Sequence, residues 1–312
     1  MLVITSSPHI RDRETVSRIM WWVVISLIPA GLMGACVFGP RAVMLMLVSV
    51  VSAVLTELVI ELLSGRRITI ADGSAVITGL LLAYNVPVGL PYWMMALGAV
   101  FAVAIGKMVF GGLGRNIFNP ALIGRAFLMA SFPAYMTRFQ IYAQGRLVSQ
   151  PTPLTVIKEG GVNAVSYKSL FLGNYAGCIG ETSVLALLIG AGILLWRGYI
   201  SLRIPLAYIL TVAVMTWVFG GDGLFGGDWL FHILSGGLML GAWFMATDMV
   251  TSPITKKGQI AFGIGCGLIT SIIRLWGGYP EGVSYSILMM NALVPYFDNL
   301  FRPRRLGERR GK

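Results

Sequence analysis

Apolar runs long enough to cross a lipid bilayer dominate this chain. About 20 residues of apolar helix span the hydrocarbon core. Charged residues make up only 12% of the 312 residues, about half the share found in soluble domains. We assign ten runs, near residues 20–38, 42–63, 74–88, 91–110, 118–136, 180–196, 204–220, 229–247, 258–275 and 281–300. They predict an all-α polytopic membrane protein of about ten transmembrane helices.

The basic residues lie between these runs rather than in one patch, although the net charge is +11. If the N-terminus is cytoplasmic and the runs alternate in direction, most of the 24 Lys and Arg residues face the cytoplasm. This arrangement places Lys107 in a cytoplasmic loop and Arg274 on the opposite side. It predicts cytoplasmic N- and C-termini, with lipid and not nucleic acid as the surroundings.

A weak internal repeat relates the two halves of the chain. Asp72-Gly-Ser resembles Ser235-Gly-Gly, and Ala83-Tyr-Asn-Val resembles Ala246-Thr-Asp-Met, each 163 residues further on. The same offset brings the first five runs roughly onto the last five. Because five is odd, the second copy must be inverted across the membrane. Chance similarity between apolar segments is the alternative.

The repeat predicts the domain organisation. Two inverted five-helix repeats, residues 1–136 and 180–300, flank an outward loop at 137–179, and 301–312 form a basic cytoplasmic tail. The third run reaches Asn85-Val-Pro and is expected to be a broken helix. Inverted repeats with interrupted helices hold binding sites near the midplane.

The loop carries the segment Ser149-Gln-Pro-Thr152-Pro-Leu-Thr155. Thr152 is suited to cap a short helix whose first residue is Pro153. Capping alone would explain this pattern. Free N–H groups and the dipole of a helix N-terminus also favour a phosphate, so a phosphoester on Thr152 would be well placed.

A second polar motif, residues 114–125, contains Asn116, Asn119 and Arg125. Two amides three residues apart share one face of a helix. They can donate to and accept from the edge of a flavin, a quinone or another heteroaromatic ring. Arg125 lies within an apolar run, where it needs an anion or a carboxylate. Hydrogen bonds between helices and an Asn-Pro helix start are the alternative interpretation.

Several acidic residues lie within the runs or near their ends. These are Glu57, Glu61, Asp72, Asp248 and Glu281. Intramembrane acids mark functional sites, but positions near the ends of runs also allow solvation by interfacial water. Both roles, ion passage and an interfacial position, stay open.

The sequence contains no complete active site. Its three cysteines, Cys36, Cys178 and Cys266, are far apart and form no CxxC motif, so the chain alone builds neither an iron–sulfur cluster nor a c-type haem site. No metal ligands are assigned. No P-loop, GxGxxG motif or Ser/His/Asp set is evident, so nucleotide chemistry must occur on another chain.

Four motifs together resemble the RnfD/NqrB family. They are Asp72-Gly-Ser-Ala-Val-Ile-Thr-Gly-Leu-Leu-Leu, Asn116-Ile-Phe-Asn-Pro-Ala, Ala246-Thr-Asp-Met-Val-Thr-Ser-Pro and Gly278-Tyr-Pro-Glu-Gly-Val. The resemblance covers nearly the whole chain. The NqrB branch has a longer N-terminal extension, whereas this chain reaches its first run by about residue 20, so it is similar to the Rnf branch.

The resemblance implies a flavin carrier in an ion-translocating complex. In the family, FMN is attached by a phosphoester to the threonine of a Ser/Thr-x-Ala-Thr motif. Residues Ser149 to Thr152 match, with Pro151 in place of alanine and Arg146 where an acidic residue is common. Thr155 is a second possible acceptor. A non-covalent flavin, riboflavin in the NqrB branch, is implied at Asn116, Asn119, Arg125 and Asp248.

It also implies partners and a location. We expect a multi-pass component of the bacterial inner membrane that relays electrons between reduced ferredoxin and NAD, coupled to Na⁺ or H⁺ movement. Other Rnf subunits, including a second flavinylated subunit and iron–sulfur subunits, and a flavin transferase are the implied partners. A small-solute channel with inverted repeats and no flavin, or a purely structural anchor subunit, would share much of this sequence pattern.

Overall fold

The computed structural model describes residues 14–143, 146–161, 165–221 and 223–302. The N-terminal residues 1–13 and most of the predicted basic tail at 301–312 lie outside this part, so the side on which the termini lie stays a prediction.

The first half of the chain forms five principal helices. These are α1 (Val16–Phe38), α2 (Pro40–Leu63), α3 (Ser74–Tyr84), α4 (Tyr92–Val103) and α5 (Pro120–Ser131). Shorter elements accompany them: the 3₁₀ turn η1 (Ile70–Asp72), the π-helical turn η2 (Ala104–Met108), which continues α4, and α6 (Pro133–Met136).

The second half repeats this layout with one interrupted helix. Its elements are α9 (Val184–Trp196), α10 (Arg203–Phe219), α11 (Trp229–Leu234), α12 (Leu238–Leu240), the π-helical turn η3 (Gly241–Met245), α13 (Lys256–Trp276) and α14 (Val283–Leu300).

The segment between the halves, predicted as an outward loop at 137–179, contains regular structure. It forms an antiparallel hairpin of β1 (Gln140–Ala143) and β2 (Arg146–Ser149), with Gln140 opposite Ser149. Two short helices follow, α7 (Pro153–Lys158) and α8 (Tyr167–Leu172). The hairpin is the one sheet in the described residues and adds a small β element to an otherwise helical fold.

The helices have the inside-out character of membrane helices. On α2, Ser49, Glu57 and Glu61 are buried, whereas Leu47, Val51, Leu55 and Val59 are each about half exposed. An apolar outer face and a polar inner face suit a helix surrounded by lipid. Within the described residues, α1, α2 and α13 are long and apolar enough to span a bilayer, and α3, α4 with η2, α5, α9 and α10 are shorter apolar helices.

Each of the ten predicted runs coincides with a helix or an interrupted helix in the described part of the chain. The number of these that cross the membrane stays a prediction.

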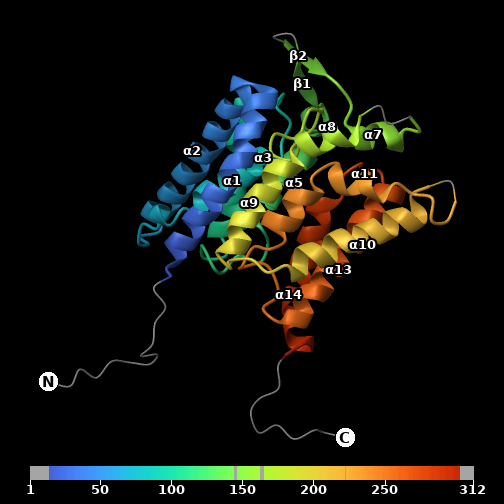
Figure 1. Ribbon diagram of the computed structural model, residues 1–312. Coiled ribbons are helices and arrows are strands. Elements are labelled where there is room, and N and C mark those ends of the chain that lie inside the picture. Colours follow the sequence, from blue (N-terminus) through green and yellow to red (C-terminus); the bar gives the residue numbers. More distant parts are fainter. Residues whose placement is uncertain (1–13, 144–145, 162–164, 222, 303–312) are drawn as a thin grey trace, which may run out of the picture.

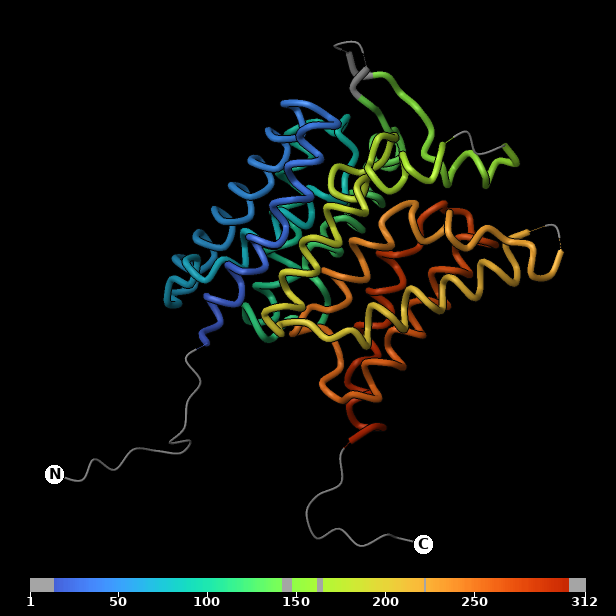
Figure 2. Tube along the Cα trace, viewed as in Figure 1, coloured from blue at the N-terminus to red at the C-terminus, as the bar shows by residue number. Residues whose placement is uncertain are grey.

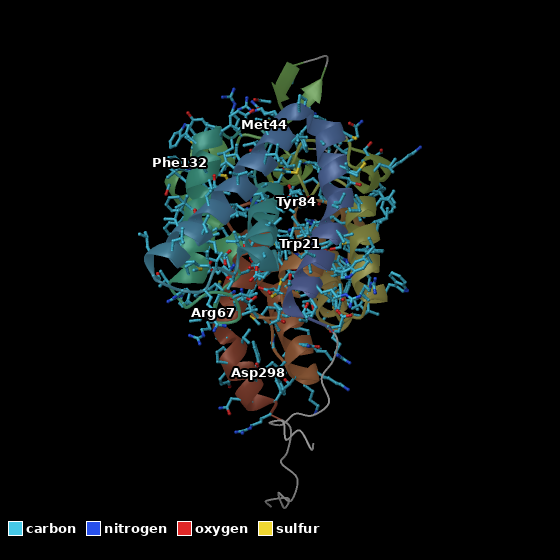
Figure 3. All side chains as sticks on the ribbon, turned by 90° about the vertical axis from the view of Figure 1, so that its left-hand side faces the viewer. Trp21, Met44, Arg67, Tyr84, Phe132 and Asp298 are labelled. Carbon is cyan, nitrogen blue, oxygen red and sulfur yellow. The ribbon has the colours of Figure 1, made fainter. Side chains whose placement is uncertain are left out.

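The helices form two groups that meet along α1 and α9. In Figure 1, α1 to α5 lie on one side and α10, α13 and α14 on the other, with α9 between them. The hairpin, α7 and α8 mark one end, which we call the hairpin face. The chain enters α1 and leaves α14 at the opposite end, the terminal face (Figure 2). Arg67 and Asp298 lie toward the terminal face, and Met44 and Phe132 toward the hairpin face (Figure 3).

The 163-residue offset recurs in the helix boundaries. Pro40 and Arg203 begin α2 and α10, and Pro120 and Val283 begin α5 and α14 (203 − 40 and 283 − 120 are both 163). At these helix starts, Arg41 donates to the carbonyl of Val88, and Arg203 donates to Gln259. The inversion of the second half relative to the first stays a prediction.

In each half of the chain, a left-handed glycine precedes a helical segment of an interrupted run. Gly73 (φ 82°) precedes α3, and Gly236 (φ 68°) precedes α12, again 163 residues apart. A positive φ favours glycine because a Cβ would clash with the backbone. α3 ends at Tyr84 after 11 residues, so the predicted break in the third run is confirmed. The eighth run is also broken, at Ser235–Gly237.

Candidate functional site

Thr152 caps α7, as the sequence predicted. Its side chain accepts a hydrogen bond from the backbone N–H of Thr155 at 3.2 Å, and Pro153 is the first helical residue. The hydroxyl groups of Thr152 and Thr155 also lie 2.8 Å apart. Thr152 is only 4% exposed, although residues 148–151 directly before it are exposed. The Thr152 side chain is therefore buried directly next to an exposed segment of the chain.

Ser149 is hydrogen-bonded outside this cap. It ends β2 and is exposed, and its Oγ accepts a hydrogen bond from Nε of Arg138 at 3.2 Å. Ser149 thus anchors the hairpin, and the structure shows no contact between its side chain and the Thr152 hydroxyl.

α7 rests on the break in the eighth run. A Cβ placed on Gly236 would lie 2.6 Å from the Leu154 side chain and 3.2 Å from Nη2 of Arg274. Leu154 also belongs to a small apolar cluster with Leu170, Tyr175 and Phe231. The threonine cap is thereby held against the interrupted helix of the second repeat.

The two asparagines of the second motif do not share a helical face, so that prediction was wrong. α5 begins at Pro120, Asn119 is its N-cap and Asn116 lies in the preceding loop. A residue before proline avoids the helical conformation, which explains the late helix start. The Oδ1 of Asn119 accepts from the backbone N–H groups of Ala121 and Leu122 at 3.1 and 3.4 Å.

Asn116, Asn119 and Asp248 nevertheless line one cavity, of about 90 Å³, near the terminal face. The Oδ1 of Asn116 is buried without a hydrogen-bond partner in the described residues. Asp248 accepts from the Thr251 hydroxyl at 3.0 Å. The remaining lining is largely apolar and includes Ile77, Leu81, Leu194 and Phe244. We call this space the terminal cavity.

A buried ion pair, not predicted from the sequence, borders the terminal cavity. Nζ of Lys107 lies 2.6 Å from Oε1 of Glu57 and 2.6 Å from the Ser74 hydroxyl, and both charged side chains are at most 2% exposed. The assignment of Lys107 to a cytoplasmic loop was therefore wrong, because the π-helical turn η2 directs it inward. Its position inside the predicted run 91–110 was the signal against a loop.

Arg274 is a second misplaced cation. It is 4% exposed and lies within α13 rather than in a loop, and the side of the membrane assigned to it stays a prediction. Its guanidinium donates to the backbone carbonyls of His232 and Ser235 at 2.5 and 3.2 Å. These carbonyls end α11, where a cation is favoured by the helix dipole.

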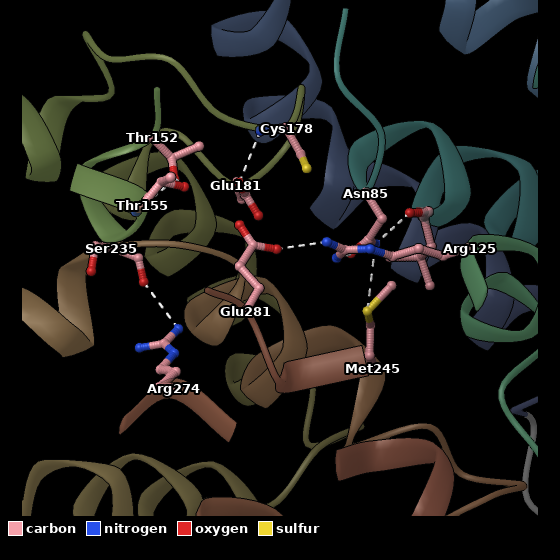
Figure 4. A network of polar contacts seen from close by, with 11 residues as sticks. Asn85, Arg125, Thr152, Thr155, Cys178, Glu181, Ser235, Met245, Arg274 and Glu281 are labelled. Carbon is pink, nitrogen blue, oxygen red and sulfur yellow. Dashed lines mark hydrogen bonds and ion pairs between the residues drawn. The ribbon is translucent and has the colours of Figure 1, made fainter. Parts of the chain in front are cut away.

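Arg125 meets a carboxylate, as its place in an apolar run required. Nη2 lies 2.6 Å from Oε2 of Glu281, and Nη1 donates to Oδ1 of Asn85 at 2.8 Å. This guanidinium does not line the terminal cavity. It belongs to a separate cluster toward the hairpin face, which also contains Glu181 (Figure 4).

A short chain of contacts joins the cluster to the terminal cavity. Nδ2 of Asn85 lies 3.5 Å from Sδ of Met245, and Nδ2 of Asn119 lies 3.5 Å from the carbonyl oxygen of Met245. Asn85 follows α3, and Met245 ends η3. The ends of the two interrupted helices thus meet between the two sites.

The fold and these sites define a class: a helical membrane protein whose interrupted helices meet at buried polar and charged groups. The family follows from sequence comparison. The sequence model of the NQR2, RnfD, RnfE family matches residues 3–307, so the chain belongs to this family. The resemblance in its four motifs is thereby confirmed.

Relatives with assigned names match over almost the full length. A Clostridium ljungdahlii protein, named as the D subunit of a proton-translocating ferredoxin:NAD(+) oxidoreductase complex, is 48% identical over 323 residues, covering 99% of this chain and 97% of the relative. Its counterpart from Acetobacterium woodii, named Na(+)-translocating, is 49% identical over 309 residues, covering 98% and 95%. An Escherichia coli protein, named as the D subunit of an ion-translocating oxidoreductase complex, is 36% identical over 350 residues, covering 99% of each.

Proposed function

We propose that this chain is the D subunit of an ion-translocating ferredoxin:NAD oxidoreductase and relays electrons through bound flavin. The main support is that the family model matches nearly the whole chain. Relatives that are 48% and 49% identical are named as the D subunit of such a complex. The sequence shows no complete active site. The chain therefore acts with other membrane and peripheral subunits, including a second flavinylated subunit and iron–sulfur subunits.

Thr152 is the proposed acceptor for covalent FMN. Its hydroxyl already lies at the N–H of Thr155, in the first turn of α7, where N–H groups and the helix dipole favour a phosphate. The exposed residues 148–151 leave room beside the cap for a ring. These residues fit a phosphoester, provided that the Thr152 hydroxyl leaves its Thr155 partner when the flavin transferase acts. Bound FMN supplies one- and two-electron transfer.

The terminal cavity is the proposed place of a second, non-covalent flavin such as riboflavin. Its apolar walls suit a ring system. A ligand N–H or O–H group could donate a hydrogen bond to Oδ1 of Asn116, which has no partner in the described residues. Asn119 and Asp248 add polar groups at the rim of the same space. Arg125 is not carried into this site, because it is bound to Glu281 and Asn85 elsewhere.

The coupling ion is not set by the family. Two relatives of nearly equal identity are named for different ions, one for protons and one for Na⁺. The proposal is therefore limited to H⁺ or Na⁺ as the transported ion.

The decisive experiment is in-gel flavin fluorescence of the denatured chain, co-expressed with a flavin transferase. We expect a fluorescent band in wild type and in Thr155→Ala, and none in Thr152→Ala. Ser166→Ala is the matched control, because Ser166 caps α8 in the same loop with the same contacts, to the N–H and the hydroxyl of Ser169. It removes a cap of equal geometry and should leave the band unchanged.

Flavin released from the native protein by denaturation tests the second site. Asn116→Ala should lower this non-covalent fraction, whereas Asn174→Ala, an exposed amide in the loop before α9, should not. A dark wild-type band and no released flavin would contradict the proposal and favour a solute channel, to be examined by flux assays. Full redox activity in Thr152→Ala would instead favour an anchor role for the loop.

A further inference from the structure

Two glutamates that face each other near the hairpin face have no role in the flavin sites. Glu181 precedes α9, and Glu281 precedes α14. Their carboxyl groups point toward one another (Figure 4), and an oxygen of each lies within 4.8 Å of the other and of the Cys178 sulfur. Glu181 is 1% exposed, and the Glu281 side chain is 9% exposed. Ionising both of two neighbouring, buried carboxyl groups costs free energy, because the like charges repel and neither is solvated by water.

The existing contacts leave one oxygen of each carboxyl group unused. Oε1 of Glu181 accepts from the backbone N–H of Cys178 at 2.8 Å, and Oε2 of Glu281 binds Arg125 at 2.6 Å. Oε2 of Glu181 and Oε1 of Glu281 are buried without a partner among the described residues. Buried polar atoms of this kind are rare and call for an explanation.

Arg125 is the cation bound to this pair in the described residues. It binds Glu281, whereas the guanidinium of Arg274 donates to the carbonyls of His232 and Ser235 and binds neither carboxyl group. The other titratable groups packed around the pair are the thiol of Cys178 and the phenol of Tyr175, which donates to the backbone carbonyl of Glu181. Neither of these groups is a cation at neutral pH.

We propose that Glu181 and Glu281 together bind one exchangeable proton, shared between their unused oxygens. A proton needs only two oxygens and would give both unused oxygens a partner. A hard metal cation needs several oxygen ligands, and the two carboxyl groups offer only two free ones. The second repeat thus holds a proton-binding carboxyl pair beside its interrupted helix.

The geometry also gives the side from which this proton exchanges. Glu281 and Arg125 line a small cavity of about 30 Å³ with Thr137, Phe139 and Tyr279, which belong to segments of the hairpin face. Toward the terminal cavity, the guanidinium of Arg125 separates the pair from Asn85 and Met245 (Figure 4). A fixed positive charge opposes the passage of a cation, so exchange takes place from the hairpin face.

Infrared spectroscopy of the purified full chain tests the proposal, because a protonated carboxyl group has a C=O band that shifts in D₂O. Protein carrying ¹³C-carboxyl glutamate should show such a band at neutral pH, shifted by the label. We expect the band to be lost in Glu181→Gln and in Glu281→Gln. It should remain in Glu159→Gln, which changes an exposed glutamate after α7.

A second variant guards against misfolding. Glu281→Asp keeps a carboxyl group at this position but, in protein made with labelled glutamate, that group carries no label. The shared proton then lies between a labelled and an unlabelled carboxyl group. We therefore expect the labelled C=O band to weaken and an unlabelled C=O band to appear. Three results would overturn the proposal: no labelled band in wild type, a band that survives both Gln substitutions, or a band that vanishes when Na⁺ replaces K⁺. The last would assign the pair to an alkali cation. None of these readouts depends on bound flavin.

Discussion

Replacing Lys107 by methionine should destabilise the protein strongly. Nζ of Lys107 has two buried contacts, each at 2.6 Å, to Glu57 and Ser74. The substitution keeps most of the side-chain volume but leaves the Glu57 carboxylate uncompensated, with Oε2 already lacking a partner in the described residues. Breaking a buried ion pair from one side costs about 3–5 kcal/mol. We expect a loss of unfolding free energy of that size.

The double variant Lys107→Met, Glu57→Met should recover most of this loss. Replacing both members of a buried pair by apolar groups is often neutral, since both desolvation costs disappear together. The double-mutant cycle should therefore show a coupling of about 3 kcal/mol or more, at or above the upper end of the range for residues in contact. Unfolding of the purified chain in mixed micelles, followed by tryptophan fluorescence, measures each free energy.

Lys257→Met is the matched control, because Lys257 is exposed at the start of α13. A surface change of this kind should alter stability by no more than about 0.5 kcal/mol. If Lys107→Met behaves like Lys257→Met, water reaches the pair and the reasoning from burial is refuted. Additive losses in the double variant would refute the pairing itself.

Two further predictions concern the hairpin face. Gly236→Ala should be more destabilising than Gly198→Ala. Both positions have a positive φ, which costs about 1–2 kcal/mol for alanine. The new Cβ at 236 would also clash with Leu154 and Arg274, whereas a Cβ at 198 would enter open space. Faster proteolysis within α7 of Gly236→Ala alone would confirm this, and equal losses would contradict it. The Tyr167 hydroxyl donates to Asp228 at 2.6 Å, and this hydrogen bond raises the pKa of the phenol above its usual value. The bond's contribution should thus be present below about pH 10 and be lost as pH rises through the raised pKa, so the denaturation midpoints of wild type and Tyr167→Phe should converge only at alkaline pH.

Local signals in the sequence predicted the local structure well. The apolar runs coincide with helices, the N-cap at Thr152 with Pro153 is present, and α3 stops at Tyr84 before the Asn-Val-Pro segment. These features depend on neighbouring residues and on proline and glycine chemistry. The hairpin was missed because strands of four residues carry too little alternation to be recognised.

The buried charge pairs could not be predicted, because their members are distant in sequence. Glu57 and Lys107 are 50 residues apart, and Arg125 and Glu281 are 156 apart. Hydrophobic periodicity says nothing about such pairings. The charge rule for loops also misplaced Lys107 and Arg274, since it assumes that cations within predicted runs belong to their ends. Arg125 was predicted to need a carboxylate, but the sequence did not indicate which one.

The internal repeat explains how one fold can hold two different polar sites. The 163-residue offset relates Asn85 to Asp248, which follow the ends of the two interrupted helices. Asn85 accepts from Arg125 beside the carboxyl pair, whereas Asp248 lines the terminal cavity. Positions related by the offset therefore lie at different sites, and the difference between an amide and an acid gives each site its own chemistry. Met245 contacts both Asn85 and Asn119 and so joins the two sites. A movement of either interrupted helix would therefore change the contacts at both sites.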